Sequence, residues 1–184
     1  QEKSLFDLSL TEEQQMTVDA MSQFAEEVLY ALAHEADHQA QFPEQLWQHL
    51  VDLGLNYYAL PEALGGVAAE QNIVSNILIA ESLAKGDFSL TAGLLSTFSV
   101  INAITRWGST QVQSMYLPVF AEDTDITATF AFQEATPAFN PFQLKTKATE
   151  QNGQMTITGE KTLVILGDTA DVFLVSAEFN GQPD

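Results

Sequence analysis

The chain has 184 residues, of which 46% are hydrophobic, so it can bury the core of one domain, or of one domain and part of another. Its formal net charge of −19, from six Lys and Arg against 25 Asp and Glu, argues against nucleic acid and anionic membrane as partners, because both require a basic surface. No apolar run approaches the roughly 18 residues of a membrane span. The sequence has no cysteine and no signal-peptide pattern, which predicts a cytoplasmic location.

Hydrophobic residues recur at helical spacing through the first two thirds of the chain, which predicts five helices. The first begins at Thr11, whose side chain can form a capping box with Gln14. The fourth has few charged residues, so we expect it to be central. The predicted helices run from Thr11 to at least Ala36, from Phe42-Pro43-Glu44 to Gly54, from about Glu70 to Lys85 with Ile73, Ile77, Ala80 and Ala84 on one face, from Phe88 to about Trp107, and from Gly108-Ser109 to about Phe120.

A β unit is predicted after the helices. Apolar and more polar residues alternate over 126–133, and Asn152-Gly153 is typical of a hairpin turn, because both residues tolerate a positive φ. Two further apolar runs, 162–166 and 172–175, predict additional strands. This part carries a net charge of −4, against −15 for residues 1–125. Its lysines, Lys145, Lys147 and Lys161, either receive an anionic ligand or solvate strand faces.

One motif suggests a different chemistry. His34-Glu35-Ala36-Asp37-His38 matches His-Glu-x-x-His, which on a helix places two imidazoles on one face for zinc, with the glutamate as base. The helical phase opposes this interpretation, because His34 lies about 200° around the helix from the apolar Leu32, on the solvated side. The third histidine, His49, is on another predicted helix. A zinc peptidase is therefore the weakest alternative, and solvent-facing polar residues are the simpler explanation.

Short motifs follow one another along the whole chain. In the helical part they are Leu10-Thr11-Glu12-Glu13-Gln14, Phe42-Pro43 with Leu46-Trp47, Pro61-Glu62-Ala63-Leu64-Gly65-Gly66, Glu81-Ser82-Leu83-Ala84, and Gly108-Ser109-Thr110-Gln111 with Tyr116-Leu117-Pro118. In the β part they are Lys145-Thr146-Lys147-Ala148, Gly159-Glu160-Lys161 and Ala170-Asp171-Val172. In this order and spacing the chain resembles the acyl-CoA dehydrogenase family of flavoproteins.

The resemblance implies an α+β fold, in which an N-terminal all-α domain over residues 1–124 precedes the first half of an antiparallel β-barrel domain over 125–184. The family's C-terminal four-helix bundle, with its catalytic glutamate, would lie outside this chain, so no catalytic residue is assigned here. The resemblance also implies FAD-dependent α,β-desaturation of an acyl-CoA thioester, and a homo-oligomer formed through regions outside the chain.

The family holds its flavin with two segments, which here are Phe132-Gln133-Glu134 and Leu163-Val164-Ile165. The resemblance therefore implies that these six residues contact FAD, and that Asn140 contacts substrate. Gln133 replaces a threonine, and Phe139-Asn140-Pro141 replaces a Gly-Ser-Asp turn whose glycine permits close backbone approach. Leu163 replaces a tryptophan that packs by the flavin, and Ile165 replaces a hydroxyl residue that donates to it.

These replacements leave two interpretations open. Either the protein is a divergent but working flavoenzyme, or it is a degenerate homologue that serves as a non-catalytic binding or assembly subunit. The loss of one hydrogen bond costs on the order of 1 kcal/mol, and several losses together weaken flavin binding. In the second interpretation residues 162–166 form an ordinary core strand.

Overall fold

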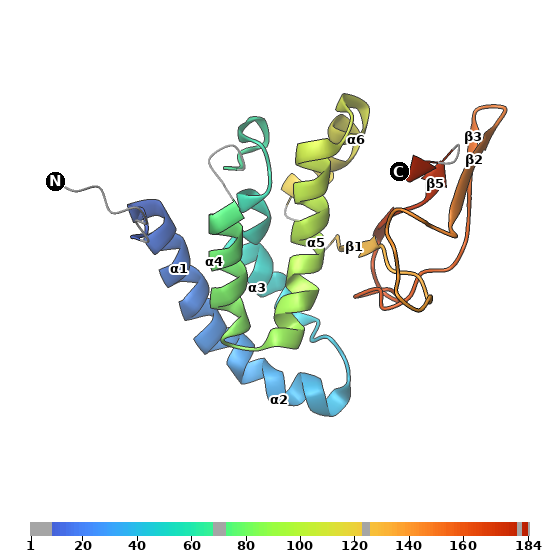
Figure 1. Cartoon of the computed structure of the whole chain (residues 1–184). Coiled ribbons are helices and arrows are strands. Elements are labelled where there is room, and N and C mark those ends of the chain that lie inside the picture. The colour runs from blue at the N-terminus through green and yellow to red at the C-terminus, as the bar shows by residue number, and fades with distance from the viewer. Residues whose placement is uncertain (1–8, 68–72, 123–125, 180–181, 184) are drawn as a thin grey trace, which may run out of the picture.

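The computed structural model describes residues 9–67, 73–122, 126–179 and 182–183. Figure 1 shows a helical part and a β part side by side, with the long helix α5 next to the first strand, β1. The helical elements are α1 (Glu12–Phe24), the π-helical turn η1 (Ala25–Leu29), α2 (Tyr30–Gln39), α3 (Gln45–Leu53), the short 3-10 turns η2 (Leu55–Tyr58) and η3 (Glu62–Leu64), α4 (Ile73–Ala84), α5 (Phe88–Trp107) and α6 (Thr110–Ala121). The predicted order of helices followed by strands is confirmed.

Local chemistry places the helix ends close to where the sequence predicts them. The Thr11 side chain accepts the Gln14 N–H and the Gln14 side chain accepts the Thr11 N–H, which is the capping box. Gly54 ends α3 with a φ of 69°, a left-handed conformation that suits glycine. The first predicted helix is a continuous helical stretch of α1, η1 and α2, which ends at Gln39. The predicted start of the third helix, about Glu70, lies outside the described residues.

Helix α5 is the core of the helical part. Asp87 caps its N-terminus by accepting the Leu90 N–H at 2.7 Å, and the Gln113 side-chain amide donates to three carbonyl groups at its C-terminus. The expectation that no apolar run approaches the length of a membrane span is wrong for α5, which could cross a membrane by length and composition. However, 56% of its most apolar window is buried inside the protein, which is the pattern of a core helix. Ten of its residues are buried: Leu90, Thr91, Gly93, Leu94, Ser96, Thr97, Phe98, Val100, Ile101 and Ile104.

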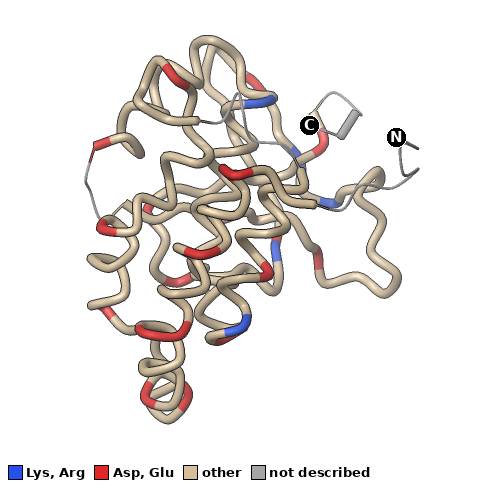
Figure 2. The backbone as a smooth tube through the Cα atoms, turned by 90° about the vertical axis from the view of Figure 1, so that its left-hand side faces the viewer, with Lys and Arg blue, Asp and Glu red and all other residues tan. Residues whose placement is uncertain are grey.

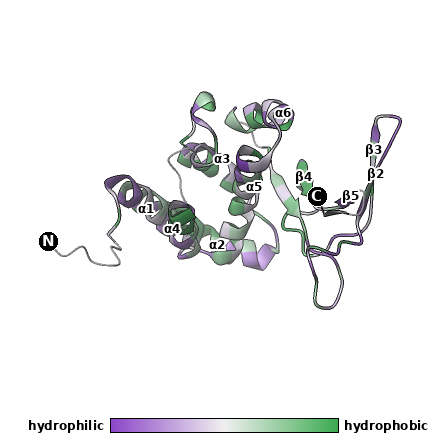
Figure 3. Ribbon diagram, turned by 45° about the horizontal axis from the view of Figure 1, so that its top comes forward, coloured by the Kyte–Doolittle hydropathy of each residue, from purple (hydrophilic) through white to green (hydrophobic). Residues whose placement is uncertain are grey.

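Helix α4 packs in a different orientation from the one its most regular apolar spacing suggests. Ile73 and Ile77 are 71% and 57% exposed, whereas Ile79 and Leu83 are fully buried. The helix is apolar on both sides, so periodicity does not determine which side packs. Figure 3 shows hydrophobic residues along α4 and along the β strands beside α5.

The strands form two small sheets. They are β1 (Ala128–Ala131), β2 (Lys147–Gln151), β3 (Gln154–Thr158), β4 (Val172–Val175), β5 (Glu178–Phe179) and β6 (Gln182–Pro183). One sheet pairs β1 with β4, with Ala128 opposite Val172, and the other has the order β3-β2-β5-β6. The predicted hairpin joins β2 to β3, and Asn152 and Gly153 have φ values of 53° and 76°, as the turn requires.

Two details of the β part differ from the expectation. An antiparallel barrel was expected, but among the described strands the β2–β3 and β5–β6 pairs are antiparallel whereas the β1–β4 and β2–β5 pairs are parallel. Residues 162–164 are irregular with a bend at Leu163, a turn begins at Ile165, and no strand forms here; Leu163 and Leu166 are left-handed with φ values of 53° and 55°. The proposed boundary between residues 124 and 125 lies outside the described residues.

The acidic residues are spread over the molecule, whereas the few basic residues are scattered singly (Figure 2). In the described part of the chain, Lys147 and Glu178 form an ion pair at 2.6 Å across β2 and β5. Both side chains are partly exposed, so this pair contributes little to stability.

Candidate functional site

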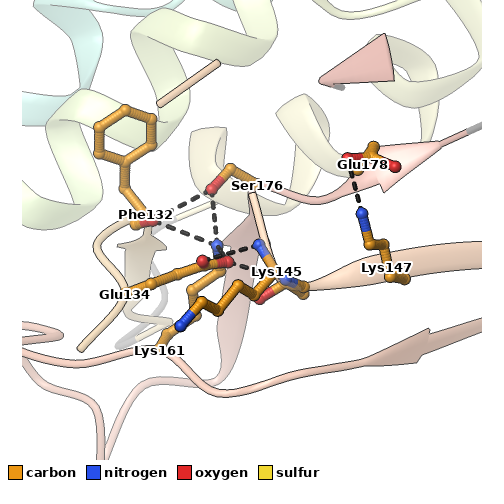
Figure 4. A network of polar contacts seen from close by, with 8 residues as sticks. Phe132, Glu134, Lys145, Lys147, Lys161, Ser176 and Glu178 are labelled. Carbon is orange, nitrogen blue, oxygen red and sulfur yellow. Dashed lines mark hydrogen bonds and ion pairs between the residues drawn. The ribbon is translucent and has the colours of Figure 1, made fainter. Parts of the chain in front are cut away.

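A cluster of polar groups around the buried side chains of Lys161 and Glu134 joins the two sheets. We call it the Lys161 cluster, and it consists of the Lys161 ammonium, the Glu134 carboxylate, the Ser176 hydroxyl and the Phe132 carbonyl (Figure 4). The Lys161 Nζ lies 3.0 Å from Ser176 Oγ and 3.2 Å from both Phe132 O and Glu134 Oε1. An ammonium has three N–H donors, so these three acceptors satisfy it completely. The cluster thereby connects the three segments that directly follow strands β1, β3 and β4.

The Glu134 carboxylate is held on both oxygens. Its Oε2 accepts the Lys145 N–H and its Oε1 accepts the Thr146 N–H, each at 2.8 Å, and Oε1 also accepts from Lys161. The residue is 3% exposed. Burial raises the pKa of this carboxyl, but the hydrogen bonds from Lys145, Thr146 and Lys161 outweigh burial and lower the pKa to about 2. Glu134 is therefore ionised at neutral pH, and both of its carboxylate oxygens accept hydrogen bonds from within the protein.

Gly159 allows the chain just before Lys161 to lie directly against Thr146. A Cβ on Gly159 would lie 2.6 Å from Thr146 Cα and 2.5 Å from Thr146 Oγ1, which leaves no room for a larger residue. The Gly-Glu-Lys motif thus combines a close backbone approach at Gly159 with the buried ammonium of Lys161. The lysine was a candidate for an anionic ligand, but the structure pairs it with Glu134.

The structure brings the two candidate flavin segments together. The Thr162 N–H donates to the Gln133 carbonyl at 2.8 Å, so the chain just before Leu163 lies against Gln133. The Thr129 hydroxyl donates to the Ile165 carbonyl and accepts from Ser96 Oγ at 3.0 Å. Helix α5, strand β1 and the 163–165 segment are therefore connected by consecutive hydrogen bonds.

The apolar side chains of these segments are exposed and not packed in a core. Phe132 is 41% exposed, Ile165 46% and Leu163 79%, so residues 162–166 do not form the core strand of the second interpretation. Val164 is half-buried, and its carbonyl accepts the Gly167 N–H within the turn. Phe132 makes an edge-to-face contact with Phe139, with ring centroids 5.3 Å apart.

Two hollows lie beside these side chains, and Phe130 lines both. The first, of about 350 Å³, is formed by the N-terminal half of α5 with Thr129, Phe130, Leu163 and Ile165. The second, of about 640 Å³, lies between the C-terminal end of α5 and the β part, where it is lined by Phe132, Phe142 and Ser176 among others. Apolar and aromatic walls with few polar groups are typical of sites for flat organic ligands.

The residues present fit the ring of a flavin. Phe130, Leu163 and Ile165 offer apolar surface to a planar group. The backbone N–H groups of Gln133 and Glu134 have no hydrogen-bond partner among the described residues, so they are available as donors. The hydroxyl that would donate from position 165 is absent, because the residue is isoleucine. The fit to a flavin thus depends on the apolar surface that these side chains offer and on backbone N–H donors, without a side-chain hydroxyl at position 165.

Asn140 and the histidines of the predicted zinc motif lie on the surface of the protein. Asn140 is exposed, and its Oδ1 accepts the Phe142 N–H at 3.0 Å, so its side chain stabilises a local turn. His34 and His38 are exposed on α2, and no group of three His, Cys, Asp or Glu suited to a metal occurs within the described ranges. The sequence analysis missed Ser96, Thr129 and Ser176, which no motif distinguishes from other hydroxyl residues.

Comparison with known proteins agrees with this architecture. The family model described as acyl-CoA dehydrogenase, N-terminal domain, matches residues 11–124. Cyclohex-1-ene-1-carbonyl-CoA dehydrogenase of Geobacter metallireducens is 30% identical over 168 residues, which are 91% of this chain and 44% of that protein. The solved structure of butyryl-CoA dehydrogenase from Megasphaera elsdenii matches with a TM-score of 0.81 at 28% identity, over 94% of this chain and 45% of that one.

A glutaryl-CoA dehydrogenase from Mycobacterium smegmatis, solved in complex with FADH2, has a TM-score of 0.80 over 93% of this chain and 44% of its own; at 24% identity this likeness shows the fold alone. The chain spans less than half the length of these relatives. Because the family model covers more than half of the chain, and the structural match continues through the β part, the chain belongs to the acyl-CoA dehydrogenase family, with its N-terminal domain and part of its middle domain.

Proposed function

We propose that this protein is a FAD-dependent oxidoreductase that oxidises an acyl-CoA thioester by α,β-desaturation. The observation that carries the proposal is the approach of residues 132–134 to residues 163–165, with exposed apolar side chains beside a hollow that α5 completes. Relatives support it, since they include a cyclohex-1-ene-1-carbonyl-CoA dehydrogenase and a short-chain specific acyl-CoA dehydrogenase.

The residues of this chain bind and orient, while bound FAD supplies the hydride acceptor. Phe130, Leu163 and Ile165 pack against a planar ring and exclude water from it. Backbone N–H groups at Gln133 and Glu134 donate to its acceptor edge, and Asn140 contacts substrate from the turn after Phe139. We assign no catalytic base among the described residues, so we expect the 184-residue chain to bind the cofactor without turnover.

Titration of the chain with FAD, followed by flavin fluorescence and visible absorption, tests the proposal. Leu163→Trp and Ile165→Thr should each strengthen FAD binding. The gain from Ile165→Thr should be about three- to tenfold, because one hydrogen bond is worth about 1 kcal/mol. Ile157→Thr is a matched control, because Ile157 is 52% exposed on β3, outside the residues that line the two hollows, and should leave the affinity unchanged.

The second candidate function is a non-catalytic binding or assembly subunit, which the replacements at Leu163 and Ile165 favour. A chain that takes up no FAD, and for which neither Leu163→Trp nor Ile165→Thr restores uptake, would support this alternative and contradict the oxidoreductase. The same titration on any longer product of the gene, followed by addition of an acyl-CoA, should bleach the flavin absorption if the enzyme is active.

A further inference from the structure

The turn of the β2–β3 hairpin places an asparagine and a glycine next to each other at the surface. Asn152 and Gly153 are both exposed. In the described part of the chain, no hydrogen bond engages the Asn152 side-chain amide or the Gly153 N–H. A Cβ at Gly153 would meet no other atom within 4 Å, so the space around this backbone is open. Neither of these neighbouring groups is therefore held by another described residue.

An asparagine followed by an unhindered backbone nitrogen can react with it, and asparagine is one of the thermolabile residues of proteins. The Gly153 nitrogen loses its proton and attacks Asn152 Cγ, the Cγ–Nδ2 bond breaks, and ammonia leaves as a succinimide ring closes. Water then opens the ring. Addition at Cγ gives aspartate, whereas addition at the main-chain carbonyl carbon gives isoaspartate, in which the chain continues through the side chain. Glycine favours ring closure, because it has no Cβ to hinder the approach.

The turn has to open before the ring can close. Asn152 is left-handed with a φ of 53°, and residues 151 and 154 pair on either side of the turn. Rotation about the Cα–C bond of Asn152 brings the Gly153 nitrogen toward Cγ, and the closed turn restricts this rotation. Every residue from 149 to 160 is exposed, so no buried side chain keeps the tip closed. A segment with so few buried contacts opens locally at a low cost in free energy.

We propose that Asn152 is a site of spontaneous deamidation, and that the isoaspartate formed there loosens the hairpin tip without disturbing the buried contacts of Glu134. Isoaspartate inserts an additional carbon into the main chain, so the turn no longer fits the pairing of Gln151 with Gln154. Both products also add a negative charge to a chain whose formal net charge is −19. The inference is independent of the proposed function, because water is the only co-reactant.

The base of the hairpin is held separately from its tip. The pair of Lys147 with Thr158 is the one farthest from the turn. Directly beyond it, the Thr146 N–H donates to Glu134 at 2.8 Å, and Gly159 lies against Thr146. Thr146 and Glu134 are both buried. A longer turn should therefore disturb the pairs next to it and leave these contacts in place.

The experiment follows the 184-residue chain during incubation at mildly alkaline pH in water labelled with heavy oxygen, with peptide mapping by mass spectrometry. The peptide that contains Asn152 should take up the label, gain the mass difference between water and ammonia, and separate into an aspartate and an isoaspartate form. The reaction should be at most about tenfold slower than in the chain unfolded in guanidinium chloride, because opening the tip costs little. Asn180 also precedes a glycine but lies outside the described residues, so the map has to resolve the two sites.

The chain offers two controls. Asn152→Gly keeps a dipeptide that suits the same turn but has no side-chain amide, so this peptide should take up no label. Asn140 is exposed like Asn152 but is followed by Pro141, which has no N–H to attack, so it should stay intact in the same sample. If Asn152 stays intact in the folded chain while the unfolded chain is converted, the proposed site is excluded.

Amide hydrogen exchange before and after conversion tests the structural effect. Exchange at Gln151 and Gln154 should become about tenfold faster, whereas exchange at Thr146 should stay the same. Unchanged exchange at Gln151 and Gln154 would show that isoaspartate does not loosen the tip. Faster exchange at Thr146 would show that the disturbance reaches Glu134, which contradicts an effect confined to the tip.

Discussion

At the scale of single residues, Glu134 carries the largest electrostatic contribution described above. Its pKa is lowered from 4.5 to about 2 by hydrogen bonds that need the ionised form. Because the pKa in the folded chain is below that in the unfolded chain, the stabilisation is fully present above pH 4.5 and is lost as pH falls toward 2.

Glu134→Gln should therefore lower the free energy of unfolding at neutral pH by about 3 kcal/mol or more, since it also leaves Lys161 without its counter-ion. The difference from the wild type should shrink as pH falls from 4.5 toward 2. Urea unfolding at a series of pH values measures it, with Glu150→Gln on exposed β2 as control. A difference that stays the same at every pH would contradict the assignment.

Leu163 holds a conformation that its side chain disfavours. Its φ is 53° and it is 79% exposed, so no buried contact compensates for the strain. Asparagine tolerates this region better than other residues with a Cβ, so Leu163→Asn should stabilise the chain by about 1 kcal/mol. Leu163→Ala removes the same apolar bulk but keeps the strained φ, and should give little gain. Equal thermal stabilities for the two variants would show that the left-handed conformation is not the cause.

At the scale of elements, Thr97 of α5 makes two hydrogen bonds to β1, in addition to the bond from Ser96 to Thr129. Thr97 is 3% exposed, its Oγ1 accepts the Ala128 N–H at 2.9 Å, and it donates to Ala128 O at 3.4 Å. Ala128 is fully buried, so its N–H has no access to water once that acceptor is lost. The helix is thereby attached to the strand that leads to Phe132.

Thr97→Val keeps the shape of the side chain and leaves that N–H unsatisfied, so it should destabilise the chain by about 1–3 kcal/mol. Denaturant unfolding at constant m-value measures the change. Thr156→Val makes the same substitution on exposed β3 and should fall within about 0.5 kcal/mol of the wild type. A loss at Thr97 no larger than at Thr156 would mean that the Thr97 hydrogen bonds do not help to hold the helix against the strand.

At the scale of the whole molecule, self-repulsion follows from the net charge of −19. Raising the salt from about 10 mM to about 150 mM shortens the screening length from roughly 30 Å to roughly 8 Å. The melting temperature should therefore rise, because repulsion among the acidic residues weakens more than the Lys147–Glu178 pair or the buried Lys161 cluster. Scanning calorimetry in sodium chloride and in choline chloride checks that the effect is one of ionic strength. A falling melting temperature in both salts would be inconsistent with this account.

Much of this fold follows from local chemistry that the sequence displays. Thr11 with Gln14, Gly54, and Asn152 with Gly153 each act through their own backbone, so they predict the ends of helices and the hairpin turn. The packed side of α4 was not predictable, because Ile73 and Ile79 are equally apolar and only tertiary contact distinguishes them.

The candidate site was predictable only in part. The order of motifs brought residues 132–134 and 163–165 into one hypothesis, and the structure places them together. The apolar run 162–166 predicted a strand, because composition does not reveal the left-handed turns that expose Leu163. Ser176 and Thr129 act through long-range hydrogen bonds, which leave no local pattern. The cellular location and the oligomeric state stay predictions from composition and from the resemblance.

The β2–β3 hairpin has a practical consequence for handling the protein. Residues 149–160 are exposed on both faces, and β2 is the only strand beside β3 in the part of the chain that is described. The free edge of β3 can therefore act as a template for strand addition by a second molecule, which leads toward fibrils in concentrated samples. Ile157→Lys places a positive charge at this edge, and light scattering during storage should then show slower growth of large particles than in the wild type.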